Sequence, residues 1–158
     1  MRVSKPLKLV CLVALIEIVG SAGTVFTAPA IGGWYASLHK PPFTPPNWVF
    51  APVWLTLFAL IGASLYLALE RGKKSEAIVP AMFTFAIQML LNVLWSALFF
   101  GLHSPLYGLI CIAALLVAIA ANAVLFFRIS RLSGLLLLPY LSWVVVAMML
   151  NLYVVLLN

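Results

Sequence analysis

Few side chains in this chain of 158 residues could take part in proton transfer or metal binding, because it contains only three acids and two histidines. Glu17, Glu70 and Glu76 do not pair at a spacing typical of general acid–base catalysis. His39 and His103 lie in expected turns without a neighbouring carboxylate, which makes a weak metal site. A solvated loop position explains His39 more simply than haem ligation does, so we expect no metal centre.

Aromatic and carboxamide side chains are more informative, because they recur at helical spacing. Amides in hydrocarbon need hydrogen-bond partners, so the face that carries Gln88 and Asn92 is expected to look inward. The residues fall on three helical faces: Phe50, Trp54 and Phe58; Gln88, Asn92, Trp95 and Phe99; and Trp143, Ala147 and Asn151. Faces of this kind could together wall a pocket for a flat hydrophobic ligand.

Composition requires that the elements carrying these faces lie in a membrane. The sequence is 66% apolar and 8% charged, with a mean hydropathy of +1.21, whereas a soluble domain has about 25% charged residues. A spanning helix needs about 20 apolar residues, and five such stretches occur, at about 7–26, 47–70, 77–100, 105–127 and 134–157. We therefore predict an all-α membrane protein with a single domain (1–158), a five-helix bundle whose long first loop closes a cavity.

The distribution of basic residues predicts the orientation of this bundle. The net charge is +6, and all but one of the basic residues fall on one side of the predicted spans, namely Arg2, Lys5, Lys8, Arg71, Lys73, Lys74, Arg128 and Arg131. Lys40 is alone on the other side. By the positive-inside rule the N-terminus is inside, and the first loop and the C-terminus are outside. We interpret the charge as an orientation signal, so nucleic acid is not expected as a partner.

Prolines shape two parts of the predicted fold. The segment Trp34–Trp54 holds five of the ten prolines, and the pairs Pro41-Pro42 and Pro45-Pro46 prevent a helix from running through it. We expect this loop to be stiff, extended and free of helix. Pro139 lies inside the fifth predicted span and is expected to kink it.

Two features of the first predicted span are harder to interpret. Glu17 lies near mid-membrane, where it is either a functional group or a protonated side chain hydrogen-bonded to a neighbouring helix. The small residues 20–23 that follow would let another backbone approach closely. Cys11 and Cys111 are expected at different depths, so we predict that they form no disulfide and act as small core residues.

The predicted topology places several of these side chains at one depth. Trp54, Asn92 and Asn151 all lie about two helical turns from the loop side, and Trp34 and Tyr35 could cover them. An aromatic belt with interhelical amide bonds is the alternative explanation. That alternative accounts for tryptophans at the interface but accounts less well for deeper ones, so we prefer a pocket. The deeper tryptophans are Trp54, Trp95 and Trp143.

Short motifs occur in order along the whole chain. They are W-Y-x-x-L-x-K-P-x-x-x-P-P at 34–46, N-x-x-W at 92–95, F-F-G at 99–101, P-Y-x-x-W at 139–143 and L-N at 150–151. These motifs resemble the translocator protein (TspO/MBR) family. Its bacterial members are called tryptophan-rich sensory proteins, and the mammalian member is the peripheral-type benzodiazepine receptor.

The resemblance implies a five-helix membrane bundle, usually dimeric, that binds porphyrins and other tetrapyrroles and needs no further cofactor. It implies ligand contacts for Trp54 and Asn92, a cavity position for Trp143 and a covering role for Trp34. Together with the residue argument above, it gives the expected ligand-binding set: Trp34, Trp54, Phe58, Gln88, Asn92, Trp95, Tyr140, Trp143, Ala147 and Asn151.

The leading hypothesis is a membrane receptor or sensor for a tetrapyrrole or a similar small hydrophobic ligand. The resemblance also implies an enzymatic alternative, light-dependent porphyrin degradation with Trp54 and Trp143 as the catalytic residues. Transport of a porphyrin or another lipophile is a third hypothesis, less attractive because the sequence has no inverted repeat. The sterol motif of animal members is incomplete, since no basic residue follows Tyr153, and the motif is weak even when complete.

Overall fold

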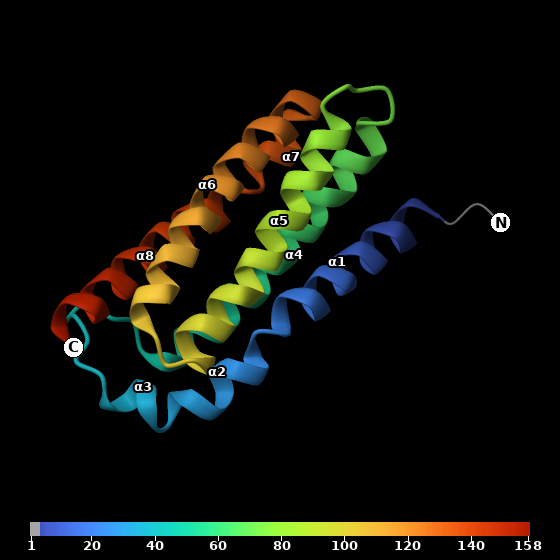
Figure 1. The fold of residues 1–158 in the computed structure, drawn as a ribbon. Coiled ribbons are helices and arrows are strands. Elements are labelled where there is room, and N and C mark those ends of the chain that lie inside the picture. The colour runs from blue at the N-terminus through green and yellow to red at the C-terminus, as the bar shows by residue number, and fades with distance from the viewer. Residues whose placement is uncertain (1–3) are drawn as a thin grey trace.

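The computed structural model describes residues 4–158, so Arg2 lies outside the described residues (Figure 1). This part of the chain forms helices and no strand. The elements, in chain order, are α1 (Lys5–Ser21), α2 (Thr24–Ile31), α3 (Trp34–Ser37), α4 (Asn47–Arg71), α5 (Ile78–Ser96), the π-helix η1 (Ala97–Gly101), α6 (Pro105–Ile129), α7 (Arg131–Leu135) and α8 (Leu138–Leu157).

The helices confirm the predicted five-helix membrane bundle. Four segments are long and apolar enough to cross a membrane by themselves: Asn47–Arg71, Ile78–Gly101, Pro105–Ile129 and Arg131–Leu157. The fifth crossing is a bent pair, because α1 and α2 meet at an angle of 47°. The long helices lie alongside one another in Figure 1, and α2 and α3 cross one end of them.

The bend between α1 and α2 corrects the straight first span predicted at 7–26. After Ser21 the helix ends, and the Ala22 amide bonds to the Val19 carbonyl three residues back. A Cβ atom on Gly23 would lie 2.6 Å from Ser96 Oγ, so the break sits directly against α5. The small residues therefore do allow a close approach, but the chain turns at that contact instead of continuing straight.

α1 and α4 approach each other closely on the other side of this bend. A Cβ atom on Gly62 would lie 2.7 Å from Val13 Cα, and one on Gly20 would overlap the ring of Phe58. Helices in lipid gain their association energy from such close packing, because lipid tails are as apolar as the side chains they replace. These glycines therefore fix α1 on α4 over the half of the bundle that contains Gly62.

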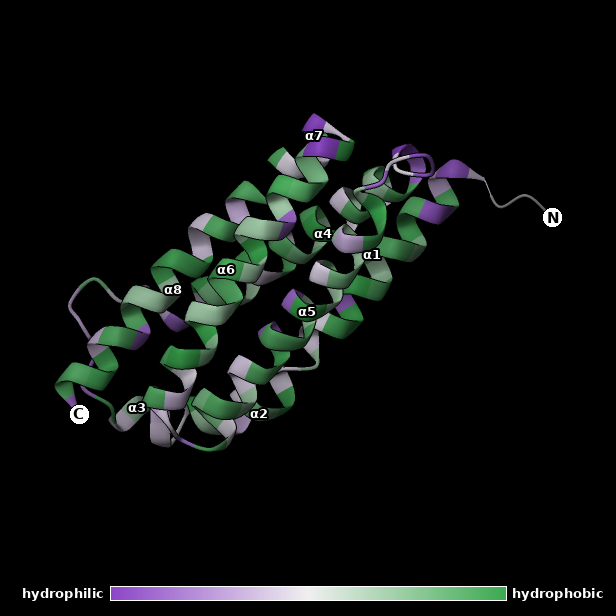
Figure 2. Cartoon of the chain, turned by 45° about the horizontal axis from the view of Figure 1, so that its top comes forward, coloured by the Kyte–Doolittle hydropathy of each residue, from purple (hydrophilic) through white to green (hydrophobic). Residues whose placement is uncertain are grey.

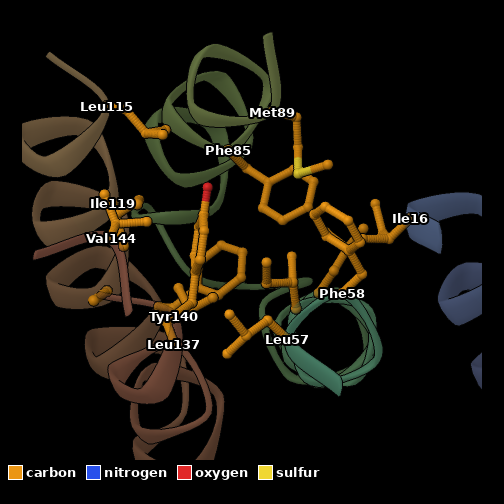
Figure 3. Packing of buried hydrophobic residues seen from close by; sticks show 14 of the residues in the cluster. Ile16, Leu57, Phe58, Phe85, Met89, Leu115, Ile119, Leu137, Tyr140 and Val144 are labelled. Atoms are coloured by element: carbon orange, nitrogen blue, oxygen red, sulfur yellow. The ribbon is translucent and has the colours of Figure 1, made fainter. Parts of the chain in front are cut away.

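The core lies between α4, α5, α6 and α8, with α1 covering one side. Figure 3 shows side chains from these helices converging around Tyr140, whose side chain is fully buried. Polar pairs cross the same interior. Ser64 Oγ donates to the Ser133 carbonyl at 2.7 Å, and Ser133 Oγ donates to the Ser64 carbonyl at 2.7 Å. Asn122 Nδ2 donates to the Ala81 carbonyl at 2.8 Å.

Two local expectations were wrong and one is confirmed. Pro139 occupies the first turn of α8, after a break at Leu136 and Leu137, so it begins a helix instead of kinking one. The first loop contains the short helix α3, so it is not free of helix. The predicted cap of the fourth span is present, since the side chain of Ser104 accepts a hydrogen bond from the Tyr107 amide.

The two predicted core cysteines differ in their environment. Neither Cys11 nor Cys111 forms a disulfide, and Cys111 is buried as expected. Cys11 is exposed on α1, so its expected core position was wrong.

The two ends of the bundle differ in charge. The basic end, which we define by Lys5, Lys8, Arg71, Lys73, Lys74, Arg128 and Arg131, appears in Figure 2 as the purple regions near α7 and the N-terminus. Two of these residues have partners: Lys8 pairs with Glu70 at 3.3 Å, and Arg71 donates to Ser130 Oγ at 2.8 Å. The opposite end, the lid end, carries residues 34–46, which we call the lid.

The predicted orientation can be measured with single cysteines in a background without Cys11 and Cys111. We expect Ser37→Cys, in the lid, to react with a membrane-impermeant maleimide in intact cells, because positive-inside bias places the lid outside. The matched Ser75→Cys at the basic end should react only after permeabilisation. The reverse pattern would overturn the orientation.

The α1–α4 contact predicts that replacing glycine by alanine destabilises the protein at Gly62 but not at Gly32. Gly62→Ala places a methyl group against the Val13 backbone and should lower the free energy of unfolding by about 1–3 kcal/mol. Gly32→Ala is the matched control, since a Cβ there meets no atom within 4 Å. Thermal unfolding in detergent measures both, and equal midpoints for the two variants would contradict this account of the contact.

Candidate functional site

A cavity of about 350 Å³ lies beneath the lid, enclosed by the α1–α2 bend, α4, α5, η1 and α8. Its volume falls within the range of about 300–1,000 Å³ that is typical of small-molecule sites. Seven aromatic side chains line it: Tyr35, Phe50, Trp54, Phe58, Trp95, Phe99 and Phe100. Its lining contains no charged side chain. The cavity is therefore suited to an apolar ligand with few polar groups.

The aromatic wall consists mainly of two stacked pairs. On α4, the rings of Trp54 and Phe58 lie 5.4 Å apart with an interplanar angle of 29°. On α5 and η1, Trp95 and Phe99 lie 5.6 Å apart at 25°. Gly20 lets the Phe58 ring pack against α1, since any Cβ there would overlap it. Rings held by their neighbours in this way present fixed faces on which a flat molecule could stack.

The π-helical turn η1 helps to place aromatic residues on the cavity. The Leu102 amide bonds to the Ala97 carbonyl five residues back, and turns of this kind are frequent at functional sites. Phe99 and Phe100, consecutive in sequence, both line the cavity. Phe99 is buried, and it also contacts the lid through Trp34 at 5.4 Å.

Tyr35 is the residue of the lid that reaches the cavity. Its ring packs on Phe100 at 5.5 Å and on Phe99 at 6.3 Å. Burial raises the pKa of the Tyr35 phenol above its ordinary value, so the group stays neutral. Its hydroxyl forms no hydrogen bond to the residues that the structure describes, and a neutral hydroxyl of this kind can donate to a ligand.

Trp95 and Asn151 form a polar link on the cavity wall. Trp95 Nε1 donates to Asn151 Oδ1 at 3.1 Å, and Asn151 Nδ2 donates to the Pro105 carbonyl at 2.7 Å. The Pro105 carbonyl is in the first turn of α6. One amide thereby joins α5, α6 and α8 and fixes the orientation of the Trp95 indole beside the cavity.

The structure brings half of the predicted ligand-binding residues to the cavity wall. Those that line it are Trp54, Phe58, Trp95, Ala147 and Asn151. The other five lie elsewhere, either deeper in the bundle or on the far side of the lid: Trp34, Gln88, Asn92, Tyr140 and Trp143.

Asn92 and Tyr140 lie one layer behind the wall. Asn92 Nδ2 donates to the Tyr140 hydroxyl at 3.0 Å, and the Tyr140 ring contacts Trp54 at 6.2 Å. Gln88, one turn from Asn92, is fully buried, and its amide has no hydrogen-bond partner among residues 4–158. Of the residues on the cavity wall, Trp54 is in ring contact with this layer.

Two predicted tryptophans do not line the cavity. Trp143 lies behind Phe50, with the rings 5.8 Å apart, and its indole N–H is buried without a partner in the described chain. Trp34 stacks on His103, with the rings 4.6 Å apart at 15°, and lines a separate open groove of about 300 Å³. Trp34 therefore holds the lid in place instead of facing a ligand.

The α2 side of the cavity was not anticipated from the sequence. Thr24, Thr27, Ala28 and Ile31 line it together with Ser21 and Ser96. A straight first span would have carried these residues away from the bundle, whereas the bend at Gly23 brings them under the lid. The signal in the sequence was the run of small residues at 20–23, which permits a bend without specifying one.

Glu17 takes no part in this site. It is half-buried on α1, and its Oε2 atom is buried without a hydrogen-bond partner among the described residues. It does not line the cavity. The expected hydrogen bond to a neighbouring helix is therefore absent among the described residues, and a functional role for Glu17 stays a prediction.

The polar link at Asn151 makes a prediction about stability. Asn151→Ala would leave the part-buried Trp95 N–H without its partner and remove a second hydrogen bond from the Pro105 carbonyl, and an unpaired group of this kind typically costs about 1–3 kcal/mol. We expect a lower thermal midpoint in detergent and a changed Trp95 fluorescence. Ser142→Ala, on an exposed face of the same helix, is the control. A wild-type midpoint for Asn151→Ala would show that the link is energetically unimportant.

Comparison with known proteins places this architecture in a family. Residues 12–157 match the model of the TspO/MBR family. The chain is 48% identical over 152 residues to the tryptophan-rich protein TspO of Archaeoglobus fulgidus, covering 96% of this chain and 97% of that one. It is 37% identical over 134 residues to the translocator protein of Bos taurus, covering 84% and 79%. It is 34% identical over 118 residues to the tryptophan-rich sensory protein of Cereibacter sphaeroides, covering 75% and 72%. The chain belongs to the TspO/MBR family of membrane proteins.

Proposed function

We propose that this membrane protein is a receptor that binds a tetrapyrrole, or a similar flat hydrophobic molecule, in the cavity beneath the lid. The observation that carries the proposal is the wall of seven aromatic side chains, contributed by the lid, α4, α5 and η1. Aromatic faces held in stacked pairs favour a planar ring system over a flexible chain. Family membership supports a sensory or receptor role, which matches the name of the Cereibacter sphaeroides relative.

The polar groups of the cavity indicate how such a ligand would lie. The neutral hydroxyl of Tyr35 and the hydroxyl of Ser96 are available as donors inside, and Asn47 is exposed at the start of α4. Because the lining has no charged residue, the carboxylates of a porphyrin would stay at the exposed edge near Asn47. The ring system would occupy the space between Trp54 and Trp95.

The lid lysine is not available to neutralise those carboxylates. Lys40 Nζ donates to the carbonyls of Tyr35, Ala36 and Leu38 at 2.6–3.4 Å. It also lies 4.7 Å from the centre of the Tyr35 ring. The ammonium thus caps the end of α3, and ligand affinity would come from ring stacking and burial.

Transport is a weaker candidate, although one relative is named translocator protein. The half of the bundle toward the basic end is filled by close-packed side chains, among them Ile61, Ala68 and Phe126, which are fully buried. A passage through that half would require the helices to separate. The cavity as described favours binding at one end of the bundle.

A porphyrin titration tests the receptor proposal. Wild-type protein in nanodiscs should show saturable quenching of tryptophan fluorescence by protoporphyrin. Trp54→Ala should raise the dissociation constant for protoporphyrin roughly tenfold, because it removes one ring of a stacked pair on the wall.

The control for this titration is Trp48→Ala, since Trp48 is 74% exposed and does not line the cavity. It should leave the affinity unchanged. Equal affinity in wild type and Trp54→Ala would refute binding in this cavity.

A further inference from the structure

We propose that ligand enters the cavity sideways from the hydrocarbon of the bilayer, through a gap between α2 and α4, and does not pass through the lid. The inference rests on the proposed function, because it describes how that ligand reaches the site. Three observations support it: the position of the opening between α2 and α4, the depth of that opening in the membrane, and the contacts that hold the lid closed.

The opening lies between the two helices that the bend separates. Several residues line the cavity and are exposed on the outside as well: Thr24 and Ala28 on α2, and Ala51 and Leu55 on α4. Leu55 is 54% exposed although it lines the cavity. Three of the four side chains are small, so the two helix edges leave space between them.

The bend in the first crossing explains why this gap exists. α1 is held on α4 by the contacts of Gly62 with Val13 and of Gly20 with Phe58. After the 47° bend, α2 instead packs against η1, where Gly101 would meet the Phe26 ring. The two edges therefore diverge from the bend toward the lid end.

The gap faces lipid and not water. Trp48, in the first turn of α4, is 74% exposed, and an exposed tryptophan at a helix end marks the membrane interface. Leu55 lies seven residues farther along, which is about 10 Å deeper at the rise of an α-helix. On the α2 side Val25 is 72% exposed and equally apolar. A ligand dissolved in the bilayer would meet this opening directly.

The lid, by contrast, is fastened on the aqueous side. The Asn158 side chain makes two hydrogen bonds to the backbone of His39: Oδ1 accepts from the amide at 2.9 Å, and Nδ2 donates to the carbonyl at 3.0 Å. The Trp34–His103 stack is a second fastening. Phe43 packs edge-on against Tyr153 of α8 at 5.2 Å as a third. Figure 1 shows the C-terminal end of α8 beside the lid.

This route defines the class of ligand. Molecules that partition into the bilayer, such as a protoporphyrin with its ring in the acyl region, reach the gap at high local concentration. Molecules confined to water would have to break the three fastenings of the lid first. The gap is therefore expected to select for lipophilic ligands by access, in addition to any selection by the cavity.

The test measures rates in nanodiscs, by mixing them with vesicles preloaded with protoporphyrin and following tryptophan quenching. Ala28→Phe and Ala51→Phe narrow the gap and should slow association roughly tenfold. Because both residues also line the cavity, the equilibrium constant is measured in parallel, and the association rate decides the test. Leu55→Ala widens the gap and should speed both rates. Val117→Phe, on the lipid-facing surface of α6, is the matched control and should change neither.

The lid variant decides between the two routes. Asn158→Ala removes the pairing with His39 and should leave both rates unchanged if entry is lateral. Wild-type rates in both narrowing variants, together with faster rates in Asn158→Ala, would overturn the inference.

A second probe does not depend on porphyrin and so separates this inference from the proposed function. Brominated acyl chains quench tryptophan on contact, and a lipid chain can enter a gap that opens to hydrocarbon. Quenching of Trp54 by brominated lipid should fall in Ala28→Phe and stay at the wild-type level in Val117→Phe. Equal quenching in these two variants would overturn the inference even if porphyrin binds, whereas absent porphyrin binding with this pattern intact would refute only the proposed function.

Discussion

The close contact of α1 with α4 is the constraint on which the rest of this structure depends. Gly62 and Gly20 bring the two helices together where a larger side chain would overlap Val13 or Phe58. Because α1 is fixed there, the bend after Ser21 must carry α2 away from α4. The bundle is consequently closed toward the basic end and open beneath the lid, and the contact of Gly20 with Phe58 lies on the cavity wall itself.

Buried polar pairs hold the remaining helices around that cavity. In a bilayer, backbone and amide groups have no water to bond, so partners within the protein stabilise them, and the Gln88 amide is an exception among the described residues. Asn92 meets Tyr140, Asn151 links Trp95 to Pro105, and the hydroxyls of Ser64 and Ser133 bond reciprocally to each other's carbonyls. These contacts set the positions of α5, α6, α7 and α8. The aromatic rings then fill the space that the helices leave.

Much of this arrangement could be predicted from the sequence, because hydropathy and helical period determine which faces are buried. The inward direction of the stripe from Gln88 to Phe99 followed from the cost of amides in lipid, and Gln88 and Asn92 are indeed buried. Their partners could not be predicted. The sequence indicates that Asn92 needs a hydrogen-bond partner, but a bound ligand and the Tyr140 hydroxyl would serve equally well. Only the fold shows that the Tyr140 hydroxyl lies 3.0 Å from Asn92 Nδ2.

The bend was missed for a related physical reason. Residues 20–23 keep the apolar character of a span, so hydropathy continues through the break, and only the contact of Gly23 with Ser96 shows where the chain turns. Pro139 was misplaced likewise, since proline is compatible both with a kink and with a first helical turn. The type of a residue limits the backbone conformations that it can adopt, and tertiary packing decides which of these conformations occurs.

The size of the cavity also depends on the angle between α1 and α2, because α2 forms one of its walls. α2 has eight residues and is therefore roughly 12 Å long. Rotation by about 5° at the bend would move its far end by about 1 Å, close to a third of the thickness of an aromatic ring. A change of angle at the bend would thus fit the cavity to ligands of different thickness. The tightly packed half of the bundle would not have to rearrange.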